Sequence, residues 1–191
     1  MVSKELIALA KCLKELGVET FEKLENRVSF QKKIYLLQVC GVNLGYMFGW
    51  DKYGPYSREL ARNAGIYIEK QEDVDSRMNE FHFKQALTAG IEKTKKLISV
   101  PAELKDIPEV DFVELLSALH FLATDGGDQK YLPADADEEE IEKVNELALG
   151  IKTHLKCYEK HLKKIWEHLY KFFPQSEPHS QKHVVMQTIS V

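Results

Sequence analysis

The sequence predicts a mainly α protein, a helical domain with a small β-hairpin or wing. Two observations support this class. Apolar residues recur at intervals of three and four along most segments of the 191-residue chain, which is the spacing of a buried helix face. Between residues 46 and 50 the pattern changes to a short aromatic run bounded by turn residues, which is typical of a strand. We therefore expect a winged-helix-like core followed by C-terminal helices.

Composition narrows the classes of function. The chain is 44% hydrophobic and 29% charged, with a formal net charge of −4, so it has a globular composition and no overall basic field for nucleic acid. Its cysteines, Cys12, Cys40 and Cys157, are odd in number and far apart, which argues against a disulfide framework. Charges occupy the start of the chain, and no apolar run approaches the ~20 residues of a membrane span. We expect a cytoplasmic protein that does not enter a membrane.

Two helices are expected in the first forty residues. Leucines at helical spacing predict a helix over 3–16, with Ser3 as its N-cap and Gly17 closing it. A second helix, over 27–40, has a broad apolar surface and ends at Gly41. Such a surface is typical of a central helix that is covered on most sides.

The next segment contains the most specific local signals. Residues 46–50 are predicted to be extended and to lead into a turn, because Pro55 fixes its own φ and disfavours a helical conformation at Gly54. Ser57 is then expected to cap a helix over 58–70. The buried side of that helix is predicted to comprise Leu60, Ala61, Ala64 and Ile68.

The middle of the chain is less regular. Residues 81–83 alternate like a strand, so a two-stranded wing within 71–88 is one interpretation. Thr88 is expected to cap a helix over 90–100, and a further helix is predicted over 111–124.

The C-terminal part reads as helical again. A Gly-Gly pair interrupts the pattern within 125–133, a candidate sub-boundary inside a single α-rich domain over 1–174. Helices are predicted over 137–149 and 152–173. Residues 175–191 are expected to form a mobile tail.

The clearest pattern joins the second predicted helix to the aromatic turn. Polar side chains at the start of that helix lie beside an otherwise apolar face. We expect Gln31 to hydrogen-bond the Gly54–Pro55 turn and so to tie the two halves together. The residues assigned to this structural motif are Gln31, Lys32, Tyr35, Gly54, Pro55 and Ser57.

Large amphipathic side chains around the same turn are candidates for binding a partner. Trp50 and the tyrosines near it are of the type enriched at interface hot spots, although packing and capping alone also explain the turn. Arg58 and Arg62 follow one helical turn apart, either as an anion-contacting face or as solvated neighbours of Glu59. The predicted partner-binding residues are Tyr46, Trp50, Tyr53, Tyr56, Arg58 and Arg62.

This pattern resembles the signature of the YwgA-like family and, more distantly, the Panacea domain of SocA-type antitoxins. The resemblance spans residues 30–60, and beyond them only the helical content is similar. The residues that match are Gln31, Lys32, Tyr35, Trp50, Gly54 and Pro55.

The resemblance implies a function of binding rather than catalysis. Panacea domains hold a toxin and in some cases hand it to a protease, and neither family has an established set of catalytic residues. We therefore expect a non-enzymatic protein-interaction module, antitoxin-like or adaptor-like, whose partner is a toxin or client protein. No cofactor is expected. No oligomeric state is predicted, and a dimer is compatible with the sequence.

The alternative hypothesis is a winged-helix transcriptional regulator that binds nucleic acid. It rests on Arg58, Arg62 and a lysine-rich side of the helix over 152–173, which is expected to face away from the apolar side. The lysines assigned to that exposed side are Lys152, Lys156, Lys160, Lys163 and Lys164.

The same helix carries a row of potential metal ligands, His154, Cys157, His161 and His168. Zinc needs ligands that converge on one point, and this row extends over too many turns to do so alone. We expect histidines with access to solvent there, and we predict no metal site and no catalytic residue.

Overall fold

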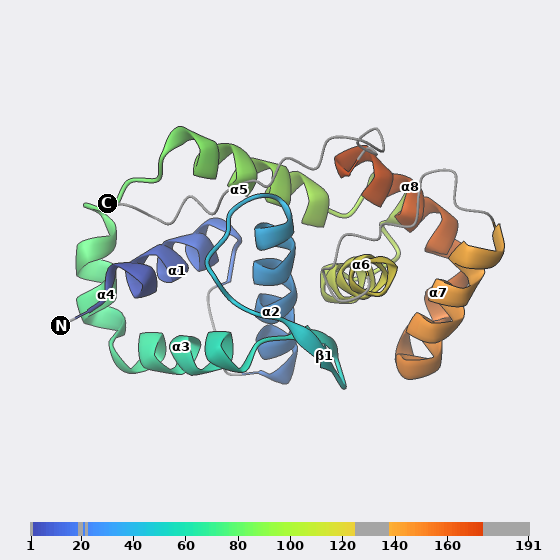
Figure 1. The fold of residues 1–191 in the computed structure, drawn as a ribbon, viewed down its shortest axis with the longest axis horizontal. Coiled ribbons are helices and arrows are strands. Elements are labelled where there is room, and N and C mark those ends of the chain that lie inside the picture. Colours follow the sequence, from blue (N-terminus) through green and yellow to red (C-terminus); the bar gives the residue numbers. More distant parts are fainter. Residues whose placement is uncertain (1, 19–20, 22, 125–137, 174–191) are drawn as a thin grey trace.

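The computed structural model describes residues 2–18, 21, 23–124 and 138–173. Within them the chain forms eight α-helices and one two-stranded antiparallel hairpin, which confirms the predicted mainly helical class (Figure 1). The candidate sub-boundary at 125–133 and the predicted tail at 175–191 lie outside the described residues. Among the residues that are described, no helix is both long and apolar enough to cross a membrane.

The first helix, α1 (Lys4–Glu15), forms as predicted. The backbone N–H of Leu6 donates to the Ser3 hydroxyl at 3.2 Å, which satisfies one free amide of the first turn. Gly17 follows the helix with φ +67°, a left-handed conformation that glycine adopts without steric cost. This helix packs against α4 and, more weakly, against the central helix.

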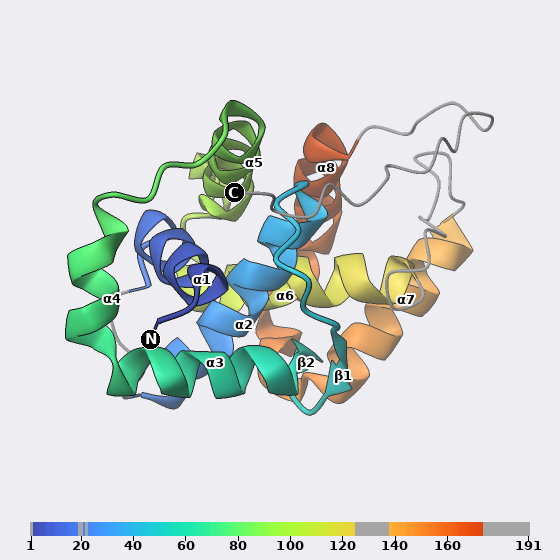
Figure 2. The same cartoon turned by 60° about the vertical axis from the view of Figure 1, so that its left-hand side comes forward.

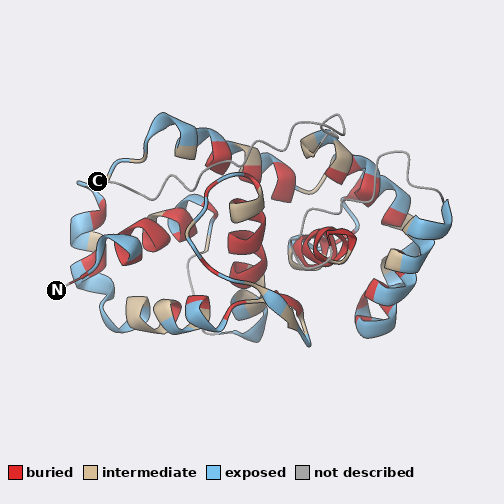
Figure 3. Cartoon of the chain, viewed as in Figure 1, coloured by how far each residue is buried: buried red, intermediate tan, exposed pale blue. Residues whose placement is uncertain are grey.

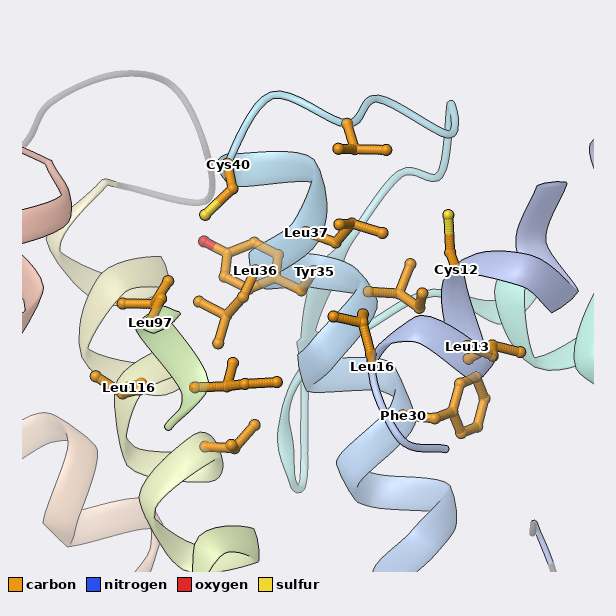
Figure 4. Packing of buried hydrophobic residues seen from close by; sticks show 14 of the residues in the cluster. Cys12, Leu13, Leu16, Phe30, Tyr35, Leu36, Leu37, Cys40, Leu97 and Leu116 are labelled. Carbon is orange, nitrogen blue, oxygen red and sulfur yellow. The ribbon is translucent and has the colours of Figure 1, made fainter. Parts of the chain in front are cut away.

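The central helix is α2 (Leu24–Val39), which begins three residues before the predicted start. It contacts α1, α5, α6 and the hairpin, and every residue from Phe30 to Leu37 is buried. Figure 3 shows buried residues along much of α2 and α6. Figure 4 shows leucines of α1 on one side of α2 and Leu97 and Leu116 on the other. The expectation of a helix covered on most sides is confirmed.

The hairpin consists of β1 (Gly49–Asp51) and β2 (Gly54–Tyr56), with Trp50 opposite Pro55 (Figure 2). The predicted strand at 46–50 was therefore placed too early, and part of the predicted turn is a second strand. The reason is the tight connection between the strands, which Gly54 allows with φ +86°.

The helix α3 (Arg58–Glu69) forms as predicted, and α4 (Gln71–Met78) follows it where the wing was expected. Ser57 caps α3 as expected, accepting from Leu60 N at 3.3 Å. The wing within 71–88 was wrong, because Val74 and Met78 form the buried side of a helix on α1.

Two further details of this region differ from the prediction. Ile68, expected to be buried, is 50% exposed, because only Leu60 and Ala64 of α3 are fully buried in the core. Phe81 and Phe83 form no strand. Their rings lie edge to face 5.5 Å apart, and Lys11 Nζ donates to the Phe81 carbonyl.

The helix α5 (Gln85–Ile98) begins before Thr88, so Thr88 is not its cap. A short 3-10 turn, Ala102–Leu104, then leads to α6 (Glu109–Ala123), which agrees with the predicted helix at 111–124. Because α6 packs on α2, α5, α7, α8 and the hairpin, it forms the second central element of the core.

The C-terminal part contains α7 (Glu138–Ile151), a 3-10 helix (Thr153–His161) and α8 (Leu162–Phe172). The prediction of one continuous helix over 152–173 was wrong. Residues 153–161 instead form a 3-10 helix, and the α-helix begins only at Leu162. At the end of α7, Lys152 has a non-helical backbone and a fully buried side chain.

Gly90→Ala is expected to destabilise the protein by about 1–3 kcal/mol, the usual cost of overpacking a close contact. A Cβ at Gly90 would lie 2.5 Å from Val42 Cγ2 and 3.1 Å from the Cys40 carbonyl oxygen, where α5 meets the end of α2. Urea unfolding followed by circular dichroism measures the change.

Gly65→Ala, in α3, is the matched control. Nothing lies within 4 Å of its added methyl group, so alanine's better helix propensity should stabilise the protein by up to about 1 kcal/mol. Equal effects of the two substitutions would contradict the close approach at Gly90.

Candidate functional site

Two glutamines on one face of α2 hold the hairpin segment at both ends. Gln31 accepts from Ser57 N at 2.9 Å and donates to Ser57 O at 3.1 Å. Gln38 accepts from Tyr46 N at 2.9 Å and donates to Tyr46 O at 2.9 Å. The predicted tether from Gln31 thus exists, although its partner is the main chain of Ser57 rather than of the Gly54–Pro55 turn. Both amides replace backbone pairing that the segment cannot provide for itself.

Lys32 supports the middle of this segment from beneath. Its side chain is 1% exposed, and Nζ donates to the Pro55 carbonyl oxygen at 2.6 Å. Pro55 has no N–H of its own, so this carbonyl is the only main-chain hydrogen-bonding group of that residue. The lysine therefore binds the side of β2 that faces α2, through a neutral acceptor.

A second buried lysine reaches the same place from the far end of the chain. Lys152 is 1% exposed, and its Nζ lies 2.5 Å from Glu114 Oε1, a carboxylate of α6 whose side chain is 6% exposed. The Lys152 amine also lies 5.9 Å from the centre of the Trp50 ring in β1. Lys32, Lys152 and Glu114 together are called the two-lysine centre.

Gly54 separates the two amines. A Cβ placed there would lie 3.4 Å from Lys152 Cε and 3.8 Å from Lys32 Cε. With φ +86° the position also requires a left-handed backbone, which a side chain would strain. Glycine at this point thus serves two purposes, the hairpin connection and the space in which the lysine side chains meet.

The electrostatics of the centre follow from its composition, two amines and one carboxylate. The pKa of Lys32 is lowered to about 7, first by burial and then by the Lys152 ammonium, whereas Glu114 and Asp51 oppose the shift. Burial also lowers the pKa of Lys152, and its hydrogen bond to Glu114 opposes that effect. At neutral pH the centre therefore holds one ammonium–carboxylate pair, beside a Lys32 whose burial and Lys152 neighbour favour its neutral form.

Lys33, the third buried polar residue in succession, points elsewhere. Its Nζ donates to the Leu16 carbonyl at 3.1 Å and pairs with Glu109 Oε1 at 2.7 Å. It joins the end of α1 to the start of α6 and takes no part in the two-lysine centre.

Tyr35 and His120 form a further buried polar contact between α2 and α6. The Tyr35 hydroxyl lies 2.7 Å from His120 Nδ1, and burial lowers the pKa of His120 to about 4. Phe48 and Phe121 lie around the tyrosine ring, at 5.3 and 5.7 Å between ring centres. This contact fixes Tyr35 of the structural motif within the core.

Of the predicted partner-binding residues, Tyr46 is not at the surface. It is 7% exposed, and its hydroxyl accepts from Asn63 Nδ2 at 3.1 Å. Its ring is part of the core, so the proposal of a contact through Tyr46 is withdrawn. Trp50 is half-buried, with its ring 5.7 Å from Phe121.

The other predicted residues remain accessible. Tyr53 and Tyr56 are half-buried, and Arg58 and Arg62 are exposed, the latter 3.8 Å from Glu59. The sequence-based interpretation missed Met47, which is 83% exposed immediately before the hairpin. Met47 is an apolar residue that follows Tyr46 in the sequence but does not share its burial. That single apolar residue was the signal available in the sequence.

The predicted row of histidines does not form one site. His168 is buried and bonds the Leu97 carbonyl at 2.8 Å, whereas His161 contacts Asp106 at 2.8 Å. His154 lies 3.6 Å from Glu114 Oε2, and Cys157 Sγ lies 3.5 Å from the His154 carbonyl oxygen. In the part of the chain that the structure describes, no group of three or more His, Cys, Asp or Glu could hold a metal ion.

Sequence reasoning also placed Lys152 wrongly. It was assigned to a solvent-facing row of lysines, but the helix break at this residue turns it into the core. Glu114 was missed, because a single carboxylate within an apolar helix has no local partner to identify it. Both follow only from tertiary structure.

No hollow opens onto the two-lysine centre among those found at the described surface. One, of about 340 Å³, lies beside Lys33, Ser29 and Glu109. Another, of about 610 Å³, lies between the ends of α5 and α8, beside Ser99 and Phe172. Neither of these two hollows is lined by a residue of the two-lysine centre.

Comparisons with protein-family models, with curated proteins and with solved structures found no match. The family resemblance of residues 30–60 stays a prediction.

Lys32→Met is expected to remove part of the pH dependence of stability. A lysine whose pKa is lowered on folding binds fewer protons in the native state, so it makes the native state more stable as pH rises from about 7 toward 10.5. In that window the residue should contribute up to about 1.4 kcal/mol of unfolding free energy per pH unit. Urea unfolding at several pH values measures the two slopes.

Lys33→Met is the control for this experiment. It removes an equally buried lysine that already has Glu109 as its carboxylate partner. The slope above pH 7 should persist in this variant. Identical slopes for the wild type and Lys32→Met would show that Lys32 keeps its ordinary pKa.

Lys152→Met is expected to cost about 3–5 kcal/mol, because it leaves the buried Glu114 carboxylate without its ammonium. Glu114→Gln leaves two buried amines with no carboxylate between them. The double variant should be more stable than the sum of the single effects by about 1–3 kcal/mol. Strictly additive effects in urea unfolding would contradict the buried pair.

Proposed function

We propose that the protein is a non-enzymatic protein-interaction module, antitoxin-like or adaptor-like, that presents its hairpin and the start of α3 to a protein partner. The observation that carries the proposal is that the main chain and the side chains of residues 46–62 have different roles. The main chain is held from beneath by Gln31, Lys32 and Gln38, while large side chains remain on the outer side. A surface that is rigid before binding loses less conformational entropy on association.

The accessible side chains suit a protein partner. Met47 is 83% exposed, Tyr53 and Tyr56 are half-buried, and Arg58 and Arg62 are exposed beside them in sequence. Aromatic residues, methionine and arginine are the types enriched in protein interfaces. The resemblance to Panacea domains supports the same class, with a toxin or client as the partner.

The second candidate function is binding of nucleic acid by a winged-helix-like core. Exposed Arg58 and Arg62 near Lys52 favour it, since they could contact phosphates. The pairing of Arg62 with Glu59 and the net charge of −4 weigh against it. Because phosphate contacts strengthen as salt falls, absence of DNA or RNA binding at low salt would exclude this candidate.

Met47→Glu combined with Arg58→Glu is expected to abolish capture of the partner without unfolding the protein. Both side chains are exposed, so the exchange changes the surface and not the core. The measurement is an affinity pull-down from the native cells, with and without nuclease, read by mass spectrometry. A stoichiometric protein that survives nuclease and is lost with the double variant is the expected result.

Leu24→Glu is the matched control, because Leu24 is an exposed apolar residue at the other end of α2. It should retain the partner. Equal capture by all three proteins, or recovery only of nucleic acid, would count against the proposal. Trp50→Ala is a weaker probe, since its ring also packs against Phe121 and its removal alters stability.

A further inference from the structure

Among the described residues, the lysine on which the hairpin rests has no carboxylate of its own. The Lys32 amine donates to the neutral Pro55 carbonyl, while the buried Glu114 carboxylate is taken by Lys152 at 2.5 Å. When both lysines are charged, the buried centre holds one positive charge in excess. When Lys32 is neutral, the charges balance and the amine still donates to Pro55.

We propose that the charge on the Lys32 amine sets how firmly the hairpin is seated on α2, so that proton uptake at Lys32 loosens the partner-binding surface. The part of this inference that concerns a partner rests on the proposed function. The part that concerns the packing of the hairpin on α2 does not rest on that function.

The hairpin is the element that yields when charge accumulates. The other walls of the centre are α2 and α6, whose apolar side chains are fully buried around Ile34 and Leu115. The hairpin has only two strands of three residues, and such a pair is marginally stable without support. Since the side chains of both lysines lie within 4 Å of a Cβ placed at Gly54, repulsion between them acts beside the strand connection.

Among the described residues, three charged groups act on Lys32. Asp51 comes from β1, Glu114 from α6, and Lys152 from the end of α7. Beyond them, His154 of the 3-10 helix lies 3.6 Å from Glu114 Oε2, with a side chain that is 54% exposed. A solvent-exposed imidazole thus lies beside the buried carboxylate of the centre.

The direction of the pH effect follows from linkage. When the hairpin is packed on α2, neutral Lys32 is favoured. When the hairpin is released from α2, Lys32 is exposed and has its ordinary pKa. The hairpin is therefore held more firmly as pH rises above about 7. The equilibrium constant for release should increase roughly 50-fold from pH 9 to pH 7 but only about twofold from pH 7 to pH 5. The equilibrium constant for release is therefore expected to change steeply with pH above neutrality and to be nearly flat below it.

Amide hydrogen exchange, read by mass spectrometry across pH 5–9 and corrected for intrinsic rates, tests the proposal on the full chain. Peptides that cover residues 46–57 should show this two-limb profile, whereas peptides of α1 serve as an internal reference. Lys32→Met should flatten the profile of the hairpin, and Lys33→Met should leave it unchanged. A hairpin profile that is the same in the wild type and Lys32→Met would overturn the proposal.

Asp51→Asn and a direct titration keep the test decisive if Lys32→Met does not fold. Asp51 is exposed and raises the pKa of Lys32, so its neutral analogue should move the break in the profile to lower pH. Nuclear magnetic resonance of the lysine Cε groups in the wild type should show one lysine titrating near neutrality. If all lysines titrate near their ordinary range, the proposal is refuted.

No partner is needed for any of these measurements. A two-limb exchange profile without a captured protein would support the role of Lys32 in holding the hairpin and refute the proposed function. Partner capture with a flat profile would support the proposed function and refute the role of Lys32.

Discussion

The structure depends on one demanding constraint, the burial of three consecutive polar side chains in the central helix. Gln31, Lys32 and Lys33 are each at most 6% exposed, and an unsatisfied group of this kind would cost several kcal/mol. Each residue is satisfied by a different partner: the main chain after the hairpin, the main chain within it, and the junction between α1 and α6. The arrangement of the elements around α2 follows from these three requirements.

This constraint also explains the unequal sides of the hairpin. Its inner side is polar and fully engaged, since α2 supplies the donors and acceptors that a two-stranded sheet lacks at its edges. Its outer side carries large side chains that are not needed for these hydrogen bonds. A short β element can therefore be rigid without a sheet, because the rigidity comes from side chains of a helix.

Local patterns in the sequence predicted what depends on neighbours along the chain. The Ser3 and Ser57 caps, the central helix and the glutamine tether were all deducible, because periodicity and turn chemistry are local signals. The position of Lys152 was not deducible. A lysine in an amphipathic helix belongs by default to the solvated side, and only a carboxylate 38 residues earlier reverses that assignment. The alternation at residues 81–83 was misleading, because the described part of the fold contains no partner strand for it.

The link from Lys152 to Glu114 has a consequence for any shortened form of the chain. The hydrogen bond joins residues 38 positions apart, so it ties the end of α7 to the interior of α6. A fragment that ended before α7 would enclose the Glu114 carboxylate without its ammonium, and removing one partner of a buried ion pair is strongly destabilising. The N-terminal helices are therefore expected to be less stable alone than within the full chain.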